Sequence, residues 1–274
     1  MITPRQLQDS AAVADHYDEL DPIYRQLWGE HVHHGLWRTG REDSGHAVEA
    51  LSDLVADKLR FSAGDHLVDI GCGYGATARR FATRGARVTG FTLSTEQLTY
   101  APPTQNVTLI RQDWLENGME TGSARGAYSI ESSEHMTDKP AFFRQARRVL
   151  EMDRRLVVCA WLASETPKAW EVRHLLEPIC YEGRLPSMGS ESEYRAMALA
   201  SGFVCEDFED LSTSVPRTWS ICLGRLLRGL VRDEALRRQV LRSRNRLFAL
   251  SVPRLMLAYR TGAMRYGIFT FVAR

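Results

Sequence analysis

The sequence predicts an α/β fold: a doubly wound, mostly parallel seven-stranded sheet with a helical N-terminal segment and inserted lid helices. Two observations predict this class. Short aliphatic runs alternate with amphipathic stretches of helical length between residues 66 and 161, which is typical of βαβ units and of a parallel sheet covered on both faces. The first aliphatic run also ends in a cluster of glycines, as expected where a strand turns sharply into a helix. With 274 residues, the chain is long enough to form one large core.

The elements follow in order along the chain. Residues 1–60 are predicted to form a helical cap, because 11–27 and 44–59 repeat apolar side chains every three or four positions, with Ser44 as the expected N-cap. Residues 61–163 are predicted to form the ligand-binding core. Its strands are expected at 66–70, 87–91, 107–110, 127–130 and 155–161, and its helices at 76–84, 95–101 and 140–150.

Residues 164–274 are expected to supply lid helices and to complete the sheet. Helices are predicted at 166–183, 190–201 and 217–250, and the last two strands at 203–211 and 266–273. Regular alternation of strand and helix lapses after residue 163. The stretches 164–190 and 212–262 are therefore the candidates for a lid over the carboxyl edge of the sheet.

Composition excludes several classes of protein. The formal net charge is +1, so nothing in the whole-chain charge favours a nucleic acid as partner. The longest clean apolar run is 156–163, far shorter than the roughly 20 residues that span a bilayer, and the first 20 residues lack the apolar centre of a secretory signal. Five scattered cysteines without a C-x-x-C spacing indicate reduced thiols, and we expect a cytoplasmic protein without a zinc site.

Positive charge is concentrated near the end of the chain. Residues 217–274 contain 13 arginines, no lysine and only two acidic side chains, Asp233 and Glu234. The densest part comprises Arg237, Arg238, Arg242, Arg244 and Arg246. One interpretation is a solvated helix face that offsets an acidic body. The alternative is a surface that attracts an anionic substrate or a membrane.

The glycine cluster is the most informative motif. Residues 67–75 read Leu-Val-Asp-Ile-Gly-Cys-Gly-Tyr-Gly, in which Gly71 and Gly73 would allow a tight turn and a close approach of a ligand to the backbone. The spacing is shorter than the G-x-G-x-x-G that seats a pyrophosphate. Asp69, just before the glycines, suits a cationic ligand such as an amino-acid ammonium group.

This motif resembles the first motif of class I S-adenosylmethionine-dependent methyltransferases, a family with a Rossmann-like sheet. Residues 90–97, Gly-Phe-Thr-Leu-Ser-Thr-Glu-Gln, resemble the end of the second strand in the cyclopropane-synthase and tocopherol-methyltransferase branch. The resemblance implies that Thr92 and Gln97 bind the ribose diol, where most class I members have an acidic residue. It also implies that Asp113 accepts from the adenine amino group and that Trp114 packs near the adenine ring.

The resemblance extends to both sides of the core. Residues 16–18 and 28–37 are similar to the helix and loop that close over the methionine end of the cofactor, which implies contacts from Tyr17 and His33. Residues 129–136 resemble the fourth-strand motif, with Glu131 on the cofactor side. The four residues 151–154 replace the usual Pro-Gly-Gly turn, which affects only that turn.

Glu134 and His135 are the candidate catalytic residues. They follow the fourth strand at the edge where ligands bind open α/β sheets, and relatives use His or Glu here as a base. The alternative is that this pair anchors its loop or orders a water. His33 and His34 lack a third ligand at metal spacing, so no metal is expected. Tyr17, Trp28 and Trp37 would favour a flat or apolar acceptor if they line the pocket.

The sequence therefore predicts a methyltransferase that uses S-adenosylmethionine on a small molecule, in the biosynthesis of a specialised metabolite. The acceptor atom is left open among carbon, nitrogen and oxygen, and a homo-oligomer is possible. One alternative is a cyclase or pericyclic catalyst that binds the cofactor without transferring its methyl group. A second is a methyltransferase for nucleic acid or protein, and a third is a lipid acceptor at a membrane face.

Overall fold

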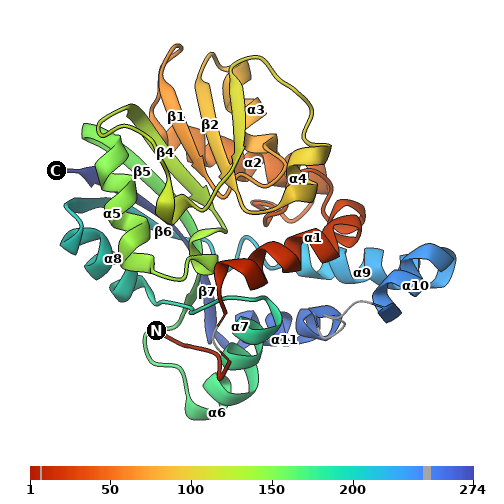
Figure 1. The fold of residues 1–274 in the computed structure, drawn as a ribbon. Coiled ribbons are helices and arrows are strands. Elements are labelled where there is room, and N and C mark those ends of the chain that lie inside the picture. The colour runs from red at the N-terminus through yellow and green to blue at the C-terminus, as the bar shows by residue number, and fades with distance from the viewer. Residues whose placement is uncertain (7, 243–247) are drawn as a thin grey trace.

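A seven-stranded sheet lies between layers of helices in the computed structural model, which describes residues 1–6, 8–242 and 248–274 (Figure 1). The strand order is β3-β2-β1-β4-β5-β7-β6, and only the pairings made by β7 are antiparallel. This arrangement confirms the predicted fold class. The strands are β1 (His66–Ile70), β2 (Arg87–Thr92), β3 (Val107–Arg111), β4 (Ala124–Ile130), β5 (Leu150–Ala163), β6 (Phe203–Asp210) and β7 (Met264–Ala273).

Both faces of the sheet are buried, because successive side chains of a strand point to opposite faces. In β1, Val68 and Ile70 join one core cluster, whereas Leu67 joins the other. Helices α5 (Lys139–Val149) and α8 (Glu191–Ala200) cover the first face, and α2 (Ser44–Leu59) and α3 (Ala76–Thr83) cover the second (Figure 1). Helix α2, which was predicted as part of the N-terminal cap, therefore belongs to the helical layer on the second face of the sheet.

Helix α1 (Ser10–Leu27) lies instead across the ends of the strands (Figure 1). Its N-cap is Asp9, whose side chain accepts a bond of 2.7 Å from the backbone N–H of Ala12. Short elements follow the neighbouring strands on this edge: α4 (Thr95–Tyr100), η1 (Trp114–Glu116) and η2 (Ser133–His135). The carboxyl ends of the parallel strands are thus roofed by α1.

Three local predictions need correction. The N-cap of α2 is Asp43, which accepts from Gly45 and His46, and Ser44 is the first helical residue. Strand β5 begins at Leu150, five residues earlier than predicted, because Leu150 pairs with Ala124 before the register shifts. Asp153 within that shift has a left-handed backbone, with φ of 61°, in place of the family's glycine-containing turn.

The predicted helix at 166–183 is interrupted. It consists of α6 (Ala169–Glu171), a π-helical turn η3 (Val172–Leu176) and α7 (Glu177–Glu182). Pro178 has no N–H to donate to the preceding turn. The carbonyl of His174 instead accepts from Nε of Arg254 at 3.1 Å, on α11 (Phe248–Thr261). This hydrogen bond therefore joins α11 to the interrupted helix, and both belong to the predicted lid.

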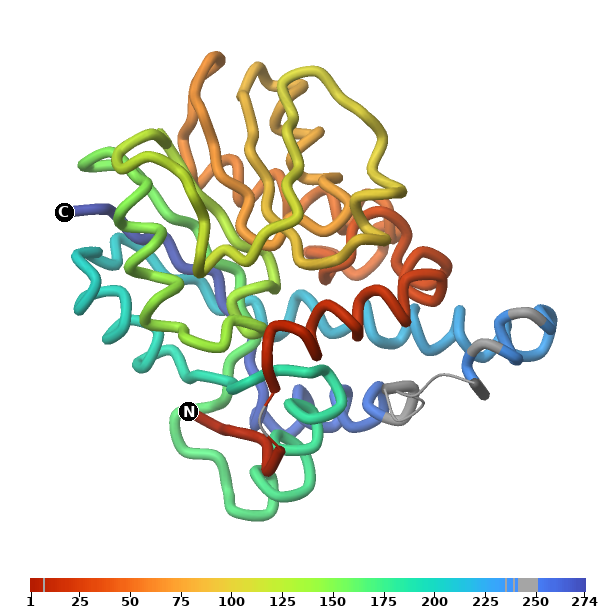
Figure 2. Tube along the Cα trace, viewed as in Figure 1, coloured from red at the N-terminus to blue at the C-terminus, as the bar shows by residue number. Residues whose placement is uncertain are grey.

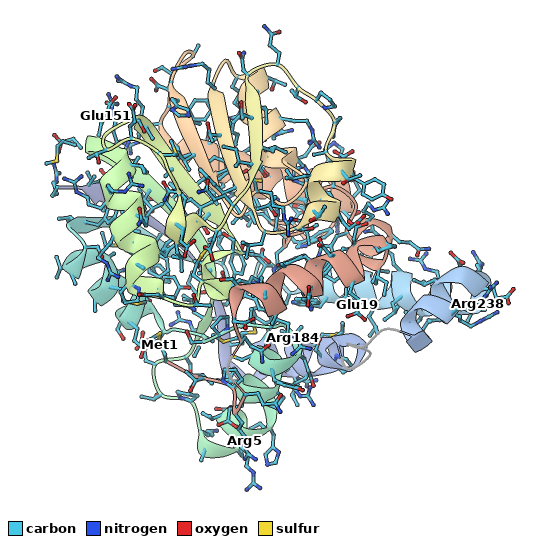
Figure 3. The ribbon with its side chains drawn as sticks, viewed as in Figure 1. Met1, Arg5, Glu19, Glu151, Arg184 and Arg238 are labelled. Atoms are coloured by element: carbon cyan, nitrogen blue, oxygen red, sulfur yellow. The ribbon has the colours of Figure 1, made fainter. Side chains whose placement is uncertain are left out.

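The predicted helix at 217–250 is also broken, at Asp233, whose backbone is extended. Helices α9 (Arg217–Arg232) and α10 (Glu234–Arg242) run away from the sheet, and Arg238 lies near the far end of the molecule (Figures 2 and 3). Arg244 and Arg246 lie outside the described residues. Arg225 donates to the Leu27 carbonyl and to Ser44 Oγ, so at least one arginine of the segment fastens helices together.

Candidate active site

The glycine turn after β1 forms the floor of the site. Gly71 and Gly73 both have left-handed backbones, with φ of 81° and 54°, a conformation that favours glycine. Their surroundings differ. A Cβ on Gly71 would overlap the Ser132 side chain, whereas a Cβ on Gly73 would meet only Nε2 of Gln97, at 3.9 Å. Gly71 therefore permits close packing of two loops, and Gly73 leaves room for a ligand.

A cavity that is partly open to solvent lies above this turn. Its wall is formed by residues at the carboxyl ends of β1, β2, β3 and β4 and by α1, which is where ligands bind in open α/β sheets. Nine of the twelve residues predicted for the site line it: Tyr17, Gly71, Gly73, Thr92, Gln97, Asp113, Trp114, Glu131 and His135.

Two polar groups lie at one end of this cavity. The hydroxyl of Thr92 donates to Oε1 of Gln97 at 2.7 Å, which fixes the amide so that Nε2 is the atom nearest Gly73. Both side chains are buried. A side-chain amide N–H is a suitable donor to a sugar hydroxyl.

Asp113 follows β3 and caps η1, accepting from the backbone N–H of Leu115 at 2.9 Å. Its other oxygen accepts from Ser10 Oγ at 2.7 Å. Trp114 beside it is buried edge-on against Phe91, with ring centroids 5.4 Å apart. The pair therefore presents a carboxylate and an apolar wall, which suit an exocyclic amine and an aromatic base.

Helix α1 is fastened over the cavity by side chains at three strand ends. Ser10 bonds Asp113 after β3, and Asp18 accepts from Ser94 after β2. Tyr17 Oη lies 2.9 Å from Nε2 of His135 after β4. The N-terminal segment thus closes the cavity from above.

A second pocket adjoins the first and shares four of its residues: Tyr17, Val32, Glu131 and His135. Its other walls are largely aromatic. They are Tyr24, Trp28, His34, Glu134, Trp161, Gly183, Leu185 and Trp219. Trp28 and Trp161 each pack edge-on against Trp219, with ring centroids 5.7 and 5.6 Å apart. Such walls favour an apolar or ring-containing molecule.

Glu131 lies between the two pockets. Its backbone is left-handed, with φ of 54°, and its carboxylate accepts four hydrogen bonds from three residues. The donors are the backbone N–H and Nδ1 of His34, Nε1 of Trp161 and the hydroxyl of Tyr266, at 2.7 to 2.9 Å. Burial alone would raise the pKa of Glu131, but its electrostatic attraction to His34 and the hydrogen bonds that His34 donates outweigh burial and lower the pKa to about 2.

Glu134 and His135 come from the short helix η2. Burial raises the pKa of Glu134 to about 7 and lowers the pKa of His135 to about 4. Glu134 accepts from the backbone N–H of Trp161 and from Ser133 Oγ. His135 has Tyr17 on Nε2 and the Arg184 carbonyl, at 3.4 Å, on Nδ1. Near neutral pH, His135 is therefore uncharged and bonded on both ring nitrogens.

Two predicted cofactor residues lie behind the cavity wall. Asp69 is buried in β1 and accepts from the Tyr128 hydroxyl at 3.0 Å, and burial raises its pKa to about 7. His33 is buried with Nδ1 against the His34 carbonyl at 2.8 Å. Neither residue lines either pocket. The structure therefore places them where they support the site from behind.

Two wall residues of the second pocket were not among the predicted catalytic and cofactor-binding residues. His34, rather than His33, lines it, and Trp219 from α9 forms its far wall. Trp37, expected as a wall residue, lies outside both pockets and donates from Nε1 to Thr218 Oγ1 at 3.0 Å. No local sequence pattern indicates which of the two adjacent rings faces the pocket, because the backbone bends at His33 and does not form a strand.

The described part of the chain contains neither a metal-binding cluster nor a membrane-spanning helix. No group of three His, Cys, Asp or Glu side chains there could hold a metal ion. No helix among residues 1–6, 8–242 and 248–274 is long and apolar enough to cross a membrane. All five cysteines are free thiols.

The cavity fits the nucleoside and methionine parts of S-adenosylmethionine, because Gly73 leaves space where polar groups from β2 and an acid after β3 converge. The fold and site define a methyltransferase dependent on this cofactor. A family model described as mycolic acid cyclopropane synthetase matches residues 5–239. The chain belongs to that family, which confirms the resemblance seen in its motifs.

Named relatives narrow the class further. The chain is 28% identical to the chloroplastic tocopherol O-methyltransferase of Arabidopsis thaliana, over 94% of this chain and 80% of that protein. It is 32% identical to 27-O-demethylrifamycin SV methyltransferase of Amycolatopsis mediterranei, over 82% and 83%. The cyclopropane synthase MmaA2 of Mycobacterium tuberculosis shares the fold, with a TM-score of 0.83 at 22% identity over 98% of this chain and 99% of that chain. These findings confirm an S-adenosylmethionine-dependent enzyme that methylates a small molecule.

Proposed function

We propose that this enzyme methylates a hydroxyl group on an apolar, ring-containing specialised metabolite. The observation that carries the proposal is the junction of two pockets at Tyr17, Val32, Glu131 and His135. One pocket has the polar groups that a nucleoside needs, and the other has aromatic walls. A methyl donor in the first and an acceptor in the second would meet at this junction.

We propose that Thr92 and Gln97 hold the ribose, and that Asp113 and Trp114 hold the adenine. Asp113 keeps lone pairs beyond those bonded to Ser10 and Leu115, because an ionised carboxylate offers about four acceptor positions. Gly71, Gly73, Tyr17 and Glu131 would surround the methionine part. When bound, the cofactor supplies a methyl group on a sulfonium, which already makes transfer favourable.

The protein's contribution is then chiefly to position the acceptor and exclude water. Alignment of two reactants contributes several kcal/mol toward lowering such a barrier. We propose Glu134 and His135 as members of the catalytic wall at the junction. His135 fixes the phenol of Tyr17, and Glu134 fixes the backbone of Trp161, so both hold surfaces against which the acceptor would lie.

The names of two relatives that match most of the chain support an oxygen acceptor. The names tocopherol O-methyltransferase and 27-O-demethylrifamycin SV methyltransferase each specify an oxygen atom as the site of methylation. The aromatic pocket supports the apolar, ring-containing part of the proposal. We further propose action in the cytoplasm, where the five free thiols would stay reduced.

Incubation with methyl-labelled S-adenosylmethionine and extracts of a metabolite-producing cell tests the proposal. Mass spectrometry should find the label in a methyl ether of an apolar small molecule. Label on carbon or nitrogen would contradict the oxygen acceptor. A substrate converted without label would indicate the cyclase alternative, and label in RNA or protein would indicate a macromolecular acceptor.

A further inference from the structure

His34 and Glu131 form a buried pair beside the aromatic pocket. Nδ1 of His34 lies 2.9 Å from Oε2 of Glu131, and the backbone N–H of His34 donates to Oε1 at 2.7 Å. Both side chains are more than nine-tenths buried. The same carboxylate is held by Trp161 and Tyr266, so its position is fixed from several elements.

This geometry sets the tautomer of the ring. Glu131 has a pKa lowered to about 2, so its carboxylate carries no proton near neutral pH and acts only as an acceptor. Nδ1 of His34 must therefore carry the proton of their hydrogen bond. In the neutral ring, Nε2 is left with a lone pair.

Nε2 of His34 has no partner in the described residues although it is buried. Nε1 of Trp219 is also buried and unpartnered there, and the two ring centroids lie 5.2 Å apart. Both residues line the aromatic pocket. Buried polar atoms are almost always satisfied, so an unpartnered lone-pair nitrogen and an unpartnered N–H donor on two residues that line one pocket point to a ligand group that both donates and accepts. A hydroxyl group is such a ligand.

We propose that His34 is the catalytic base of the reaction and that Glu131 is its positioning residue. This inference rests on the proposed function. The acceptor oxygen forms a bond to the methyl carbon, and the carbon–sulfur bond breaks with its electron pair passing to sulfur. The hydroxyl proton passes to Nε2 of His34 and then to solvent. Glu131 stabilises the imidazolium formed, and Trp219 orients the oxygen through one lone pair.

The other candidates for this role are already engaged. Nε2 of His135 accepts from the Tyr17 hydroxyl, and Glu134 is bonded to Trp161 and Ser133. The titratable groups that face His34 or share its pocket are Glu131, His33, Tyr259, Tyr266, Tyr17, Tyr24, Glu134 and His135. Burial raises the pKa of both Tyr259 and Tyr266 and lowers that of His33. Glu131 is thus the ionised group bonded to the ring.

A spectroscopic test needs no acceptor. Protein labelled with ¹⁵N-histidine is studied by long-range ¹H–¹⁵N correlation, with S-adenosylhomocysteine bound, and His34 is assigned from the spectrum of a His34→Gln variant. We expect the tautomer with the proton on Nδ1 and a bare Nε2, and we expect Glu131→Gln to weaken that preference. A proton on Nε2 throughout the range of activity would overturn the proposal.

A kinetic test follows with a hydroxyl acceptor that the wild-type enzyme methylates. We expect His34→Gln to lower kcat/KM by about 10²–10⁴-fold and to abolish the fall in rate on the acidic side of the pH profile. Glu131→Gln should lower the rate and shift that fall. His66→Gln, at the start of β1, is the matched control and should retain the wild-type profile, since His66 bonds Ser123 and Thr89 and lines neither pocket.

The outcomes separate the two proposals. If the wild-type enzyme methylates no hydroxyl, the proposed function fails. If it does, and His34→Gln keeps both its rate and its acidic fall, the base assignment alone fails. Calorimetry with S-adenosylhomocysteine checks that the variants still bind the cofactor product, and the spectrum of the wild-type protein decides the tautomer even where a variant does not fold.

Discussion

The hydroxyl of Tyr17 lies 2.9 Å from Nε2 of His135, which comes 118 residues later in the chain. Tyr17 comes from α1, and His135 comes from the loop after β4. Burial raises the pKa of the phenol and lowers that of the imidazole, so Tyr17 donates to a neutral ring. This single bond joins the roof of the cofactor cavity to the wall of the acceptor pocket.

Tyr17→Phe should weaken this closure. The change keeps the aromatic ring but leaves Nε2 of His135 buried without a partner, which typically costs about 1–3 kcal/mol. We expect a loss of unfolding free energy of that order in urea, together with weaker cofactor binding. Tyr100→Phe is the control, because Tyr100 is half exposed on α4. Equal stability of the two variants would argue that the bond contributes nothing.

Gly73→Val should abolish cofactor binding while preserving the fold. The new side chain would project into the space beside Gln97, and we expect affinity for S-adenosylhomocysteine to fall at least about 100-fold, measured by calorimetry. Gly122→Val is a matched control, since Gly122 also has a left-handed backbone, with φ of 65°, and open space around it. Both variants carry similar backbone strain, so retained binding in Gly73→Val would refute the role of the turn.

Trp28→Phe should affect the acceptor and spare the cofactor. Trp28 lines only the aromatic pocket, where it packs against Tyr24 and Trp219. A smaller ring leaves a gap against the acceptor, and we expect its KM to rise about tenfold, the effect of roughly 1.4 kcal/mol. The exposed Trp170 provides the control variant Trp170→Phe. A change confined to cofactor affinity would place Trp28 in the other pocket.

Glu134→Gln should change how stability depends on pH. Burial raises the pKa of Glu134 from 4.5 to about 7, so the folded protein favours the protonated acid. That stabilisation is fully present below pH 4.5 and is lost as the pH rises to about 7. Glutamine does not titrate, so the unfolding free energy of the variant minus that of the wild type should increase across this window. Chemical unfolding at several pH values measures it, and a constant difference would contradict the raised pKa.

Much of the fold could be predicted because the relevant signals are local. Short aliphatic runs between helical stretches predicted the strands, and the glycine turn indicated the ligand-binding edge. The breaks in the long helices could not be foreseen in the same way. The break at η3 depends on two residues. Pro178 cannot donate to the carbonyl of His174, and the distant Arg254 donates to that carbonyl instead. No spacing within the segment reports such a partner.

The site shows the same division. Residues at the end of a strand or shortly after it, such as Thr92, Gly73 and Asp113, were predicted from the motifs and do line the cavity. Asp69 and His33 belong to the same motifs but face inward, because side-chain direction depends on local backbone and packing. The importance of His34 arises from its bond to Glu131, 97 residues away. The roles of all these residues, the possible homo-oligomer and the absence of a nucleic-acid partner stay predictions.

The three fastenings of α1 have a consequence for turnover. Ser10, Tyr17 and Asp18 each reach a different strand end above the nucleoside cavity. Spent cofactor leaving past that helix must undo these bonds together, a motion of the kind that limits the rate of many enzymes. We therefore expect product release, which requires α1 to move away from the strand ends, to limit the turnover rate more than methyl transfer does.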